Sequence, residues 1–203
     1  MPRPKQRTPE LRDRVLQVAV AMLASDGVAG FTTRKVAEKA ATSTPAVYEL
    51  FGAKAGLVRE MLIEGFRMLR ASFDRLEETD DPRADLVHVM DALRKFVRDH
   101  PALSEVMFSR PFADFDPGEA GRKAGSAVRL FVIGRVRRCI EAGVIEGDET
   151  DIAHVLVSLT QGLAATEAAG WLGTSKASVN RRWDLAVRAV LDGLRSTRWT
   201  RPC

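Results

Sequence analysis

Apolar residues recur at three- and four-residue spacing along most of the chain, which is the pattern of amphipathic helices. The first such series consists of Leu11, Val15, Val18, Ala19, Met22 and Leu23. Thr8-Pro9 before this series is typical of a helix start, and Gly27 after it is typical of a stop. Period-two alternation over the length of a strand is absent. The pattern predicts an all-α protein of about nine helices.

Two short helices are expected next, over residues 34–40 and 44–51, joined by the tight turn Ala41-Thr42. Thr32 or Thr33 can cap the first of them, and Ser43 or Thr44 can cap the second. Helices this short are unstable alone and must pack on the helix that precedes them. The three together predict a compact unit that contains a helix-turn-helix.

Longer helices are predicted from Lys54 to about Glu78 and over residues 83–99, 101–109, 119–143, 150–170 and 176–196. The clearest loop is SRPFADFDPG, residues 109–118, which contains two prolines and a glycine. We therefore expect two domains. Residues 1–53 form a helix-turn-helix domain with a basic N-terminal arm, and residues 54–203 form a helical regulatory and dimerisation domain.

The net charge of +4 comes from the first sixty residues. Residues 1–60 contain ten Lys and Arg against six Asp and Glu, whereas residues 61–203 contain 21 of each kind. This asymmetry indicates a phosphate-rich partner at the N-terminal end, although a segment this short can acquire such a charge by chance.

Several classes of protein are disfavoured by what the sequence lacks. No apolar run reaches the length of about 18 residues that a membrane helix needs, and no apolar core follows the basic N-terminus as in a secretory signal. The two cysteines, Cys139 and Cys203, favour a cytoplasmic address, and Cys139 is expected to be a small core residue. Catalytic and phosphate-loop motifs are missing, and the histidines are scattered without ligand spacing. We expect no catalytic residues, no cofactor and no metal site.

The segment FTTRKVAEKAATSTPAVYELFGAKAGLVREML, residues 31–62, resembles the DNA-binding signature of the TetR (tetracycline repressor) family. The match is closest over residues 32–37 and 44–48, and at Phe51 and Lys54. The resemblance implies a homodimer that binds a pseudo-palindromic double-stranded operator, with two recognition helices about 34–36 Å apart or a multiple of it. It also implies repression that a small apolar or amphipathic effector relieves.

The recognition helix should enter the major groove by its N-terminal end. Ser43, Thr44, Pro45 and Ala46 lie there and are small enough to approach base edges. Arg34 is the best candidate for a bidentate contact with guanine.

Tyr48, Lys54 and Thr33 are candidates for phosphate contacts. Alternatives remain open: Arg34 and Lys54 can be solvated surface charges, and Tyr48 can be a structural cap on the small core. Three further cations, Lys35, Lys39 and Arg59, are expected to be solvated. The basic arm of Arg3, Lys5 and Arg7 is either a tail or a DNA contact.

Two positions in the turn depart from the family pattern. Ala41 stands where the family usually has glycine, and Thr42 stands where it has a branched apolar residue. Alanine in a left-handed conformation costs about 1 kcal/mol. Either the turn avoids that conformation or the helix-turn-helix domain is slightly strained.

Residues 96–109 and 156–173 resemble, more loosely, the regulatory domain of one TetR subgroup, with Thr160-Gln161-Gly162 where that subgroup often has Trp-His-Gly. Aromatic and sulfur side chains can wall an apolar pocket, and polar residues in apolar stretches need partners. The candidate pocket residues are Phe66, Phe96, His100, Met107, Phe108, Phe112, Gln161 and Glu167. The alternative for the apolar ones is that they are plain core.

The last two helices carry apolar stripes that suit a dimer interface. The candidate interface residues are Leu156, Leu159, Leu163, Trp183, Val187, Val190 and Leu191. Paired across a two-fold axis, these helices would form a four-helix bundle, unless the stripes only face the chain's own core. The long helix from Lys54 is expected to connect the two domains.

Overall fold

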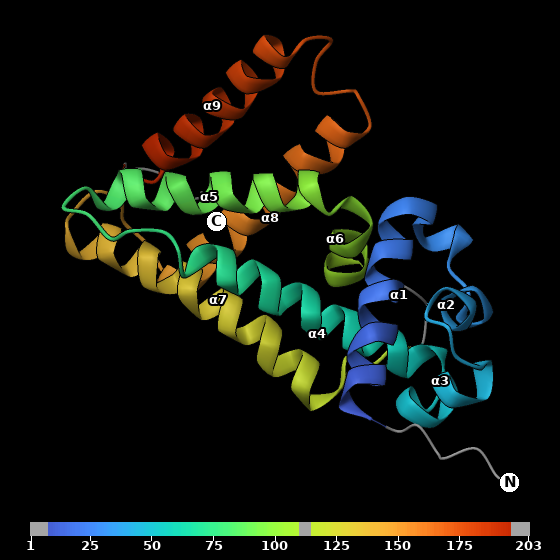
Figure 1. The fold of residues 1–203 in the computed structure, drawn as a ribbon. Coiled ribbons are helices and arrows are strands. Elements are labelled where there is room, and N and C mark those ends of the chain that lie inside the picture. Colours follow the sequence, from blue (N-terminus) through green and yellow to red (C-terminus); the bar gives the residue numbers. More distant parts are fainter. Residues whose placement is uncertain (1–7, 110–114, 196–203) are drawn as a thin grey trace, which may run out of the picture. The chain divides into compact units, whose positions relative to one another are not determined.

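The computed structural model describes residues 8–109 and 115–195. Within these ranges the chain forms nine α-helices and no strand, so the predicted all-α fold is confirmed (Figure 1). The helices belong to two compact units. Unit 1 comprises the chain up to Met68 and residues 100–125, and unit 2 comprises residues 69–99 and the chain from Ser126 onward.

Unit 1 contains the predicted helix-turn-helix. It is built from α1 (Pro9–Gly30), α2 (Thr33–Lys39), α3 (Thr44–Phe51), α6 (Pro101–Phe108), the first part of α4 (Lys54–Phe73) and the start of α7 (Gly118–Glu141). α2 packs against α1 and α3, and α6 packs against α1 (Figure 1). The division of the chain at residue 53 stays a prediction.

The start and end of α1 follow the sequence signals. Thr8 Oγ1 accepts a hydrogen bond from the backbone N–H of Leu11 at 3.2 Å, which caps the first turn. Gly27 interrupts the helix with φ 66° and ψ −179°. The apolar stripe between these two points is buried and forms the core with residues of α2 to α4: Leu11, Val15, Ala19, Met22, Leu23, Val36, Ala37, Val47, Phe51, Leu57 and Met61.

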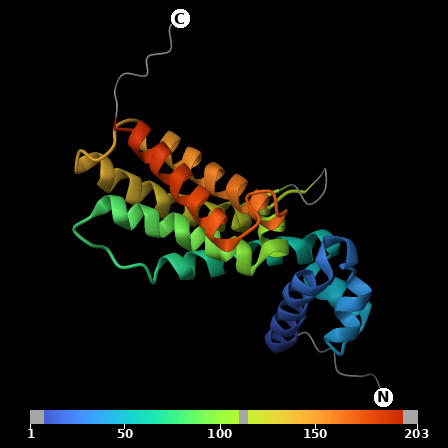
Figure 2. The same cartoon turned by 90° about the horizontal axis from the view of Figure 1, so that it is seen from above.

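Unit 2 is formed by α5 (Pro82–Asp99), α8 (Glu149–Ala168), α9 (Lys176–Gly193) and the remainders of α4 and α7. α5 packs against α8, and α9 lies beside α8, as the red and orange helices of Figure 2 show. The helices of the described ranges include none that is long and apolar enough to cross a membrane.

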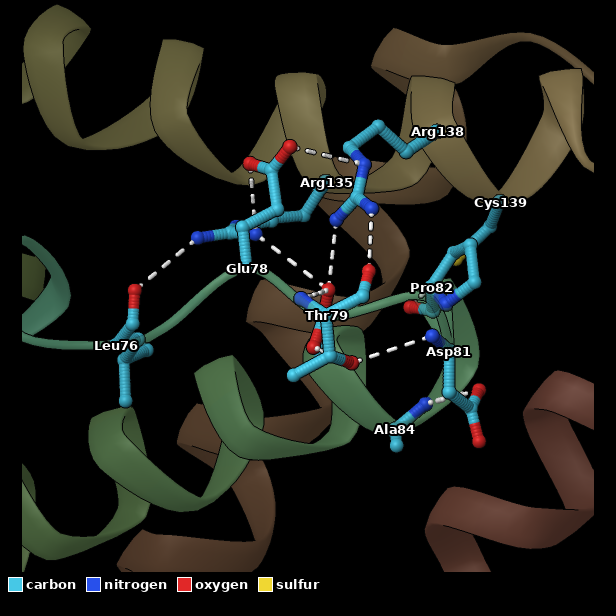
Figure 3. Close-up of polar contacts among 10 residues, drawn as sticks. Leu76, Glu78, Thr79, Asp81, Pro82, Ala84, Arg135, Arg138 and Cys139 are labelled. Atoms are coloured by element: carbon cyan, nitrogen blue, oxygen red, sulfur yellow. Dashed lines mark hydrogen bonds and ion pairs between the residues drawn. The ribbon is translucent and has the colours of Figure 1, made fainter.

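α4 ends at Phe73, so the predicted extension to about Glu78 is wrong. The reason is a tertiary contact that the local pattern does not contain. The connecting segment from Asp74 to Asp81 is held by hydrogen bonds to α5 and α7, and these replace the helical turns that its sequence allows (Figure 3).

Asp85, only 2% exposed, is the centre of this contact. Its carboxylate accepts hydrogen bonds from Thr79 N at 3.0 Å, Thr79 Oγ1 at 2.8 Å and Arg138 Nη1 at 2.6 Å. Arg135 Nη1 lies 3.6 Å from the same carboxylate and 2.9 Å from Glu78 (Figure 3). Burial alone raises the pKa of Asp85, but the hydrogen bonds from Thr79 and Arg138 outweigh it and lower the pKa to about 2.

Cys139 lies at the edge of the same cluster and is fully buried, as expected for a core residue. Its Sγ donates a hydrogen bond to the carbonyl oxygen of Pro82 at 3.0 Å. Burial raises the pKa of the thiol to about 11, so the group is uncharged at neutral pH.

We predict that Asp85→Asn lowers the free energy of unfolding by about 3 kcal/mol at pH 7, because the buried Arg135 and the half-buried Arg138 lose the buried carboxylate that they share and keep only the exposed Glu78. The folded-state pKa of about 2 lies below the ordinary value of 3.8. The stabilisation is therefore complete above the ordinary pKa and is lost as the pH falls toward 2. Urea denaturation at pH 7 and pH 3 measures both effects, and the exposed Asp80→Asn serves as control. An equal loss in the two variants would contradict the prediction.

Candidate nucleic-acid interface

α2 begins with a side-chain cap that leaves its first turn on the surface. Thr32 Oγ1 accepts a hydrogen bond from Lys35 N at 3.3 Å, which settles the choice between Thr32 and Thr33 as the cap. Thr33 is 6% exposed, so its side chain is withdrawn from the surface. Arg34, the next residue, is exposed.

α3 is capped by Ser43, whose Oγ accepts a hydrogen bond from Ala46 N at 3.2 Å. Pro45 is exposed, and Thr44 and Ala46 are half-buried. On the opposite side of the helix, Val47 and Phe51 are buried in the core of the unit. The first turn of α3 therefore presents short side chains, and the backbone can approach a flat surface closely.

The turn between the two helices is strained at one residue. Ala41 has φ 51°, and it is the one residue other than glycine with positive φ in the described ranges. Thr42 N donates to the carbonyl oxygen of Ala37 at 2.9 Å, and Arg14 Nε of α1 donates to that of Ala40 at 3.2 Å. Of the two alternatives left open by the sequence, the structure has the strained turn.

The start of α4 approaches the end of α3 so closely that only glycine fits. A Cβ built on Gly56 would lie 1.8 Å from the backbone oxygen of Phe51. Gly52, the C-cap of α3, has φ 77°. This packing places Lys54 at the first position of α4, where it is exposed and its Nζ lies 5.9 Å from the ring centroid of Phe31.

Most basic side chains between residues 8 and 60 already have a partner within unit 1. Arg12, Arg14, Lys35, Lys39 and Arg59 contact Glu60, Ala40, Gly30, Asp26 and Asp116, respectively. Lys35 and Lys39 are exposed nevertheless, and Arg59 is half-buried, so the expectation that these three cations are solvated and do not bind DNA stays a prediction. Arg34 makes no side-chain hydrogen bond or ion pair within the described part of the chain, so its guanidinium remains available.

Tyr48 projects from α3 and is 45% exposed, although it belongs to the large hydrophobic residues. A phenol so placed can reach a phosphate, and the exposure argues against a purely structural cap. The arm of Arg3, Lys5 and Arg7 lies outside the described residues.

Two family models match the chain. One, described as "Bacterial regulatory proteins, tetR family", covers residues 15–61, and the other, "Tetracyclin repressor-like, C-terminal domain", covers residues 86–190. The chain belongs to the TetR family of transcriptional regulators. The family prediction from residues 31–62 is confirmed, and DNA binding is the function of this class of protein.

Two HTH-type transcriptional regulators and one solved structure resemble the chain over most of its length. The HTH-type transcriptional repressor KstR of Mycolicibacterium smegmatis is 26% identical over 187 residues, which cover 90% of this chain and 87% of KstR. The HTH-type transcriptional regulator YvkB of Bacillus subtilis is 28% identical over 151 residues, 73% of this chain and 78% of YvkB. A structure of a Rhodococcus sp. RHA1 protein of unknown function superposes with a TM-score of 0.80 at 26% identity, covering 96% of this chain and 100% of that one.

The candidate pocket residues of this TetR-family chain are divided between the two units. Phe66, His100, Met107 and Phe108 belong to unit 1, whereas Phe96, Gln161 and Glu167 belong to unit 2. Phe112 lies outside the described residues.

In unit 1 the rings of Phe66 and Phe108 meet edge to face with centroids 5.9 Å apart. A Cβ on Gly65 would lie 2.5 Å from Met107 Sδ, so α6 packs tightly on α4 at this point. Phe66, Met107 and Phe108 thus contribute to the packing of unit 1.

Glu167 has partners that the sequence did not reveal. Arg94 Nε and Nη2 donate to its two carboxylate oxygens at 2.8 and 3.0 Å, and Trp183 Nε1 donates at 2.7 Å. The guanidinium of Arg94 also lies over the Trp183 ring, 4.5 Å from its centroid. Burial raises the pKa of Glu167, but these donors outweigh it, and the pKa is lowered. The carboxylate therefore joins α5, α8 and α9, and its place in a ligand pocket stays a prediction.

Part of the predicted dimer interface is internal to unit 2. Leu156, Trp183, Val187 and Leu191 are buried within the single chain, which favours the alternative interpretation for these four residues. Leu159, Leu163 and Val190 are partly exposed. A helical stripe shows that one face is buried but does not show what buries it.

We predict that Ala41→Gly raises the free energy of unfolding by about 0.5–1 kcal/mol, because glycine adopts positive φ without the steric penalty of a Cβ. Urea denaturation followed by circular dichroism measures the change. Ala169→Gly is the matched control, since Ala169 is likewise an exposed alanine at the C-terminal end of a helix but has φ −75°. The control should lose stability, and a loss at position 41 as well would show that the turn is not strained.

Proposed function

We propose that the chain is a cytoplasmic homodimeric repressor, and not an enzyme, that binds a pseudo-palindromic operator and is released by a small apolar or amphipathic effector. Within each subunit, α3 enters the major groove with Ser43, Thr44, Pro45 and Ala46 toward the bases. Tyr48, Lys54 and the backbone N–H of Thr33 contact phosphates.

The observation that carries this proposal is the unpaired guanidinium of Arg34. The neighbouring cations are engaged within unit 1, whereas Arg34 is exposed at the N-terminal end of α2, a helix that packs on α3. The guanidinium of Arg34 has two parallel N–H donors and no internal partner, so it can bind both acceptors on the major-groove edge of guanine. Family membership and the similarity to the repressor KstR support the repressing role.

The outward faces of α8 and α9 are the surfaces that we assign to the second subunit. Leu185 of α9 is 68% exposed, and Val155 of α8 is exposed one turn from the partly exposed Leu159. Gly162 and Ala165, on the same side of α8 as Val155, are small and exposed. Small side chains let two helices approach each other, and exposed apolar ones gain from being covered.

The prediction for DNA binding concerns Arg34→Ala. Operator affinity should fall by about 1–3 kcal/mol, while affinity for random duplex changes little, because a base contact carries specificity. The operator is first selected from a random duplex pool, and then titrated by fluorescence anisotropy at several salt concentrations. Lys35→Ala removes the same charge one residue away and is the control. If both variants lose affinity equally on both duplexes, Arg34 contributes only to general electrostatic attraction.

The prediction for assembly concerns Gly162→Arg. A Cβ at Gly162 meets no atom within 4 Å inside the chain, so the substitution leaves the subunit intact. We expect a folded monomer in sedimentation velocity, together with loss of binding to the palindromic operator. Gly134→Arg on α7 is the control, because its Cβ also meets no atom within 4 Å. A dimeric Gly162→Arg variant would exclude this face of α8.

A further inference from the structure

Unit 1 has a groove of about 620 Å³. It lies between α1, the part of α4 that leads up to Met68 and the N-terminal end of α6. Volumes of about 300–1,000 Å³ are typical of sites for small organic molecules. None of the residues that face it belongs to the DNA-contacting turn of α3, so an occupant would not compete directly with operator DNA.

The floor of the groove is apolar. It is formed by Leu16, Val20, Ala21 and Ala24 of α1 and by Met68 of α4. Leu16, Val20 and Met68 are partly exposed, and the two alanines are exposed. Such a surface gains free energy when an apolar molecule covers it, and the alanines leave the room that the molecule needs.

The polar part of the lining has one unbalanced negative charge. Arg67 Nε and Nη2 donate to the two oxygens of Glu64 at 2.7 and 2.5 Å, so this pair is neutral as a whole. The carboxylate of Asp13 has no hydrogen bond or ion pair within the described part of the chain. Gln17 and the half-buried His100 complete the polar lining.

The cations beside Asp13 in the sequence are directed elsewhere. Arg12 Nη2 lies 2.7 Å from Glu60 Oε1, and its guanidinium carbon lies 5.4 Å from the ring centroid of Phe51. Arg14 Nε donates to the carbonyl oxygen of Ala40. Asp13 is exposed and pairs with no cation of the described residues, so a cation that enters the groove can pair with it.

We propose that this groove binds a lipophilic organic cation, with apolar groups on the alanine floor and the positive charge beside Asp13. This inference rests on the proposed function in one respect, since it assigns to the groove an effector that lowers operator affinity. A single hydrogen bond connects this part of α1 to the helix-turn-helix. Arg14, next to Asp13, donates it to the carbonyl oxygen of Ala40 at the strained turn. A ligand that favours another position of this part of α1 would shift the turn.

Two ions of the same size and shape but opposite charge, tetraphenylphosphonium and tetraphenylborate, test the site in the full-length protein without DNA. Isothermal titration calorimetry should show saturable binding of the phosphonium and at least tenfold weaker binding of the borate. Asp13→Asn should weaken phosphonium binding by about five- to tenfold, as expected for one partly screened charge. Glu119→Gln, an exposed acid elsewhere in unit 1, should leave it unchanged.

Ala21→Phe fills the floor of the groove and should abolish phosphonium binding, while circular dichroism and operator affinity without the ion stay as in the wild type. Equal binding of the two ions, or unchanged phosphonium binding in Asp13→Asn and Ala21→Phe, would overturn the site. If the ion binds as expected but leaves the operator titration unchanged, the groove is a binding site without the regulatory role. A failure of operator binding itself, in the absence of any ion, would instead overturn the proposed function.

Discussion

The packing of α2 and α3 on α1 is the constraint on which the candidate DNA-binding surface depends. Helices of 7 and 8 residues are not stable alone, so their positions are fixed by the core they share with α1 and by the turn that joins them. That turn has an alanine with φ 51° and is held from α1 by Arg14. The surface that we propose for DNA is thus positioned by residues of the core and of the turn behind it.

The sequence predicts the helices of unit 1 well because the signals that start and end them come from neighbouring residues. The caps at Thr8 and Ser43, the interruption at Gly27 and the apolar stripe of α1 all depend on neighbours within a few residues. The helix-turn-helix was likewise recognised as one continuous segment of about thirty residues. The strain at Ala41 could be named as an alternative from the sequence, and only the backbone geometry decides it.

The features of unit 2 that the sequence does not reveal depend on contacts between distant residues. α4 was predicted too long because Thr79 and Asp85 bind Arg138, 53 residues beyond Asp85. The sequence does not show that the partner of Glu167 is Arg94, which lies 73 residues away in the chain. The apolar stripes of α8 and α9 were correctly found, but their periodicity does not distinguish the chain's own core from a second subunit. The available guanidinium of Arg34 also becomes evident only when the partners of the other cations are known.

Because Cys139 is buried, the reactivity of its thiol measures internal motion in unit 2. A thiol with a pKa of about 11 and no access to solvent does not react with alkylating reagents or peroxide while the helices around it stay packed. Its rate of alkylation therefore follows the frequency with which α5 and α7 separate at Pro82. Oxidative conditions should leave the regulator chemically unchanged at this residue for as long as the unit remains closed.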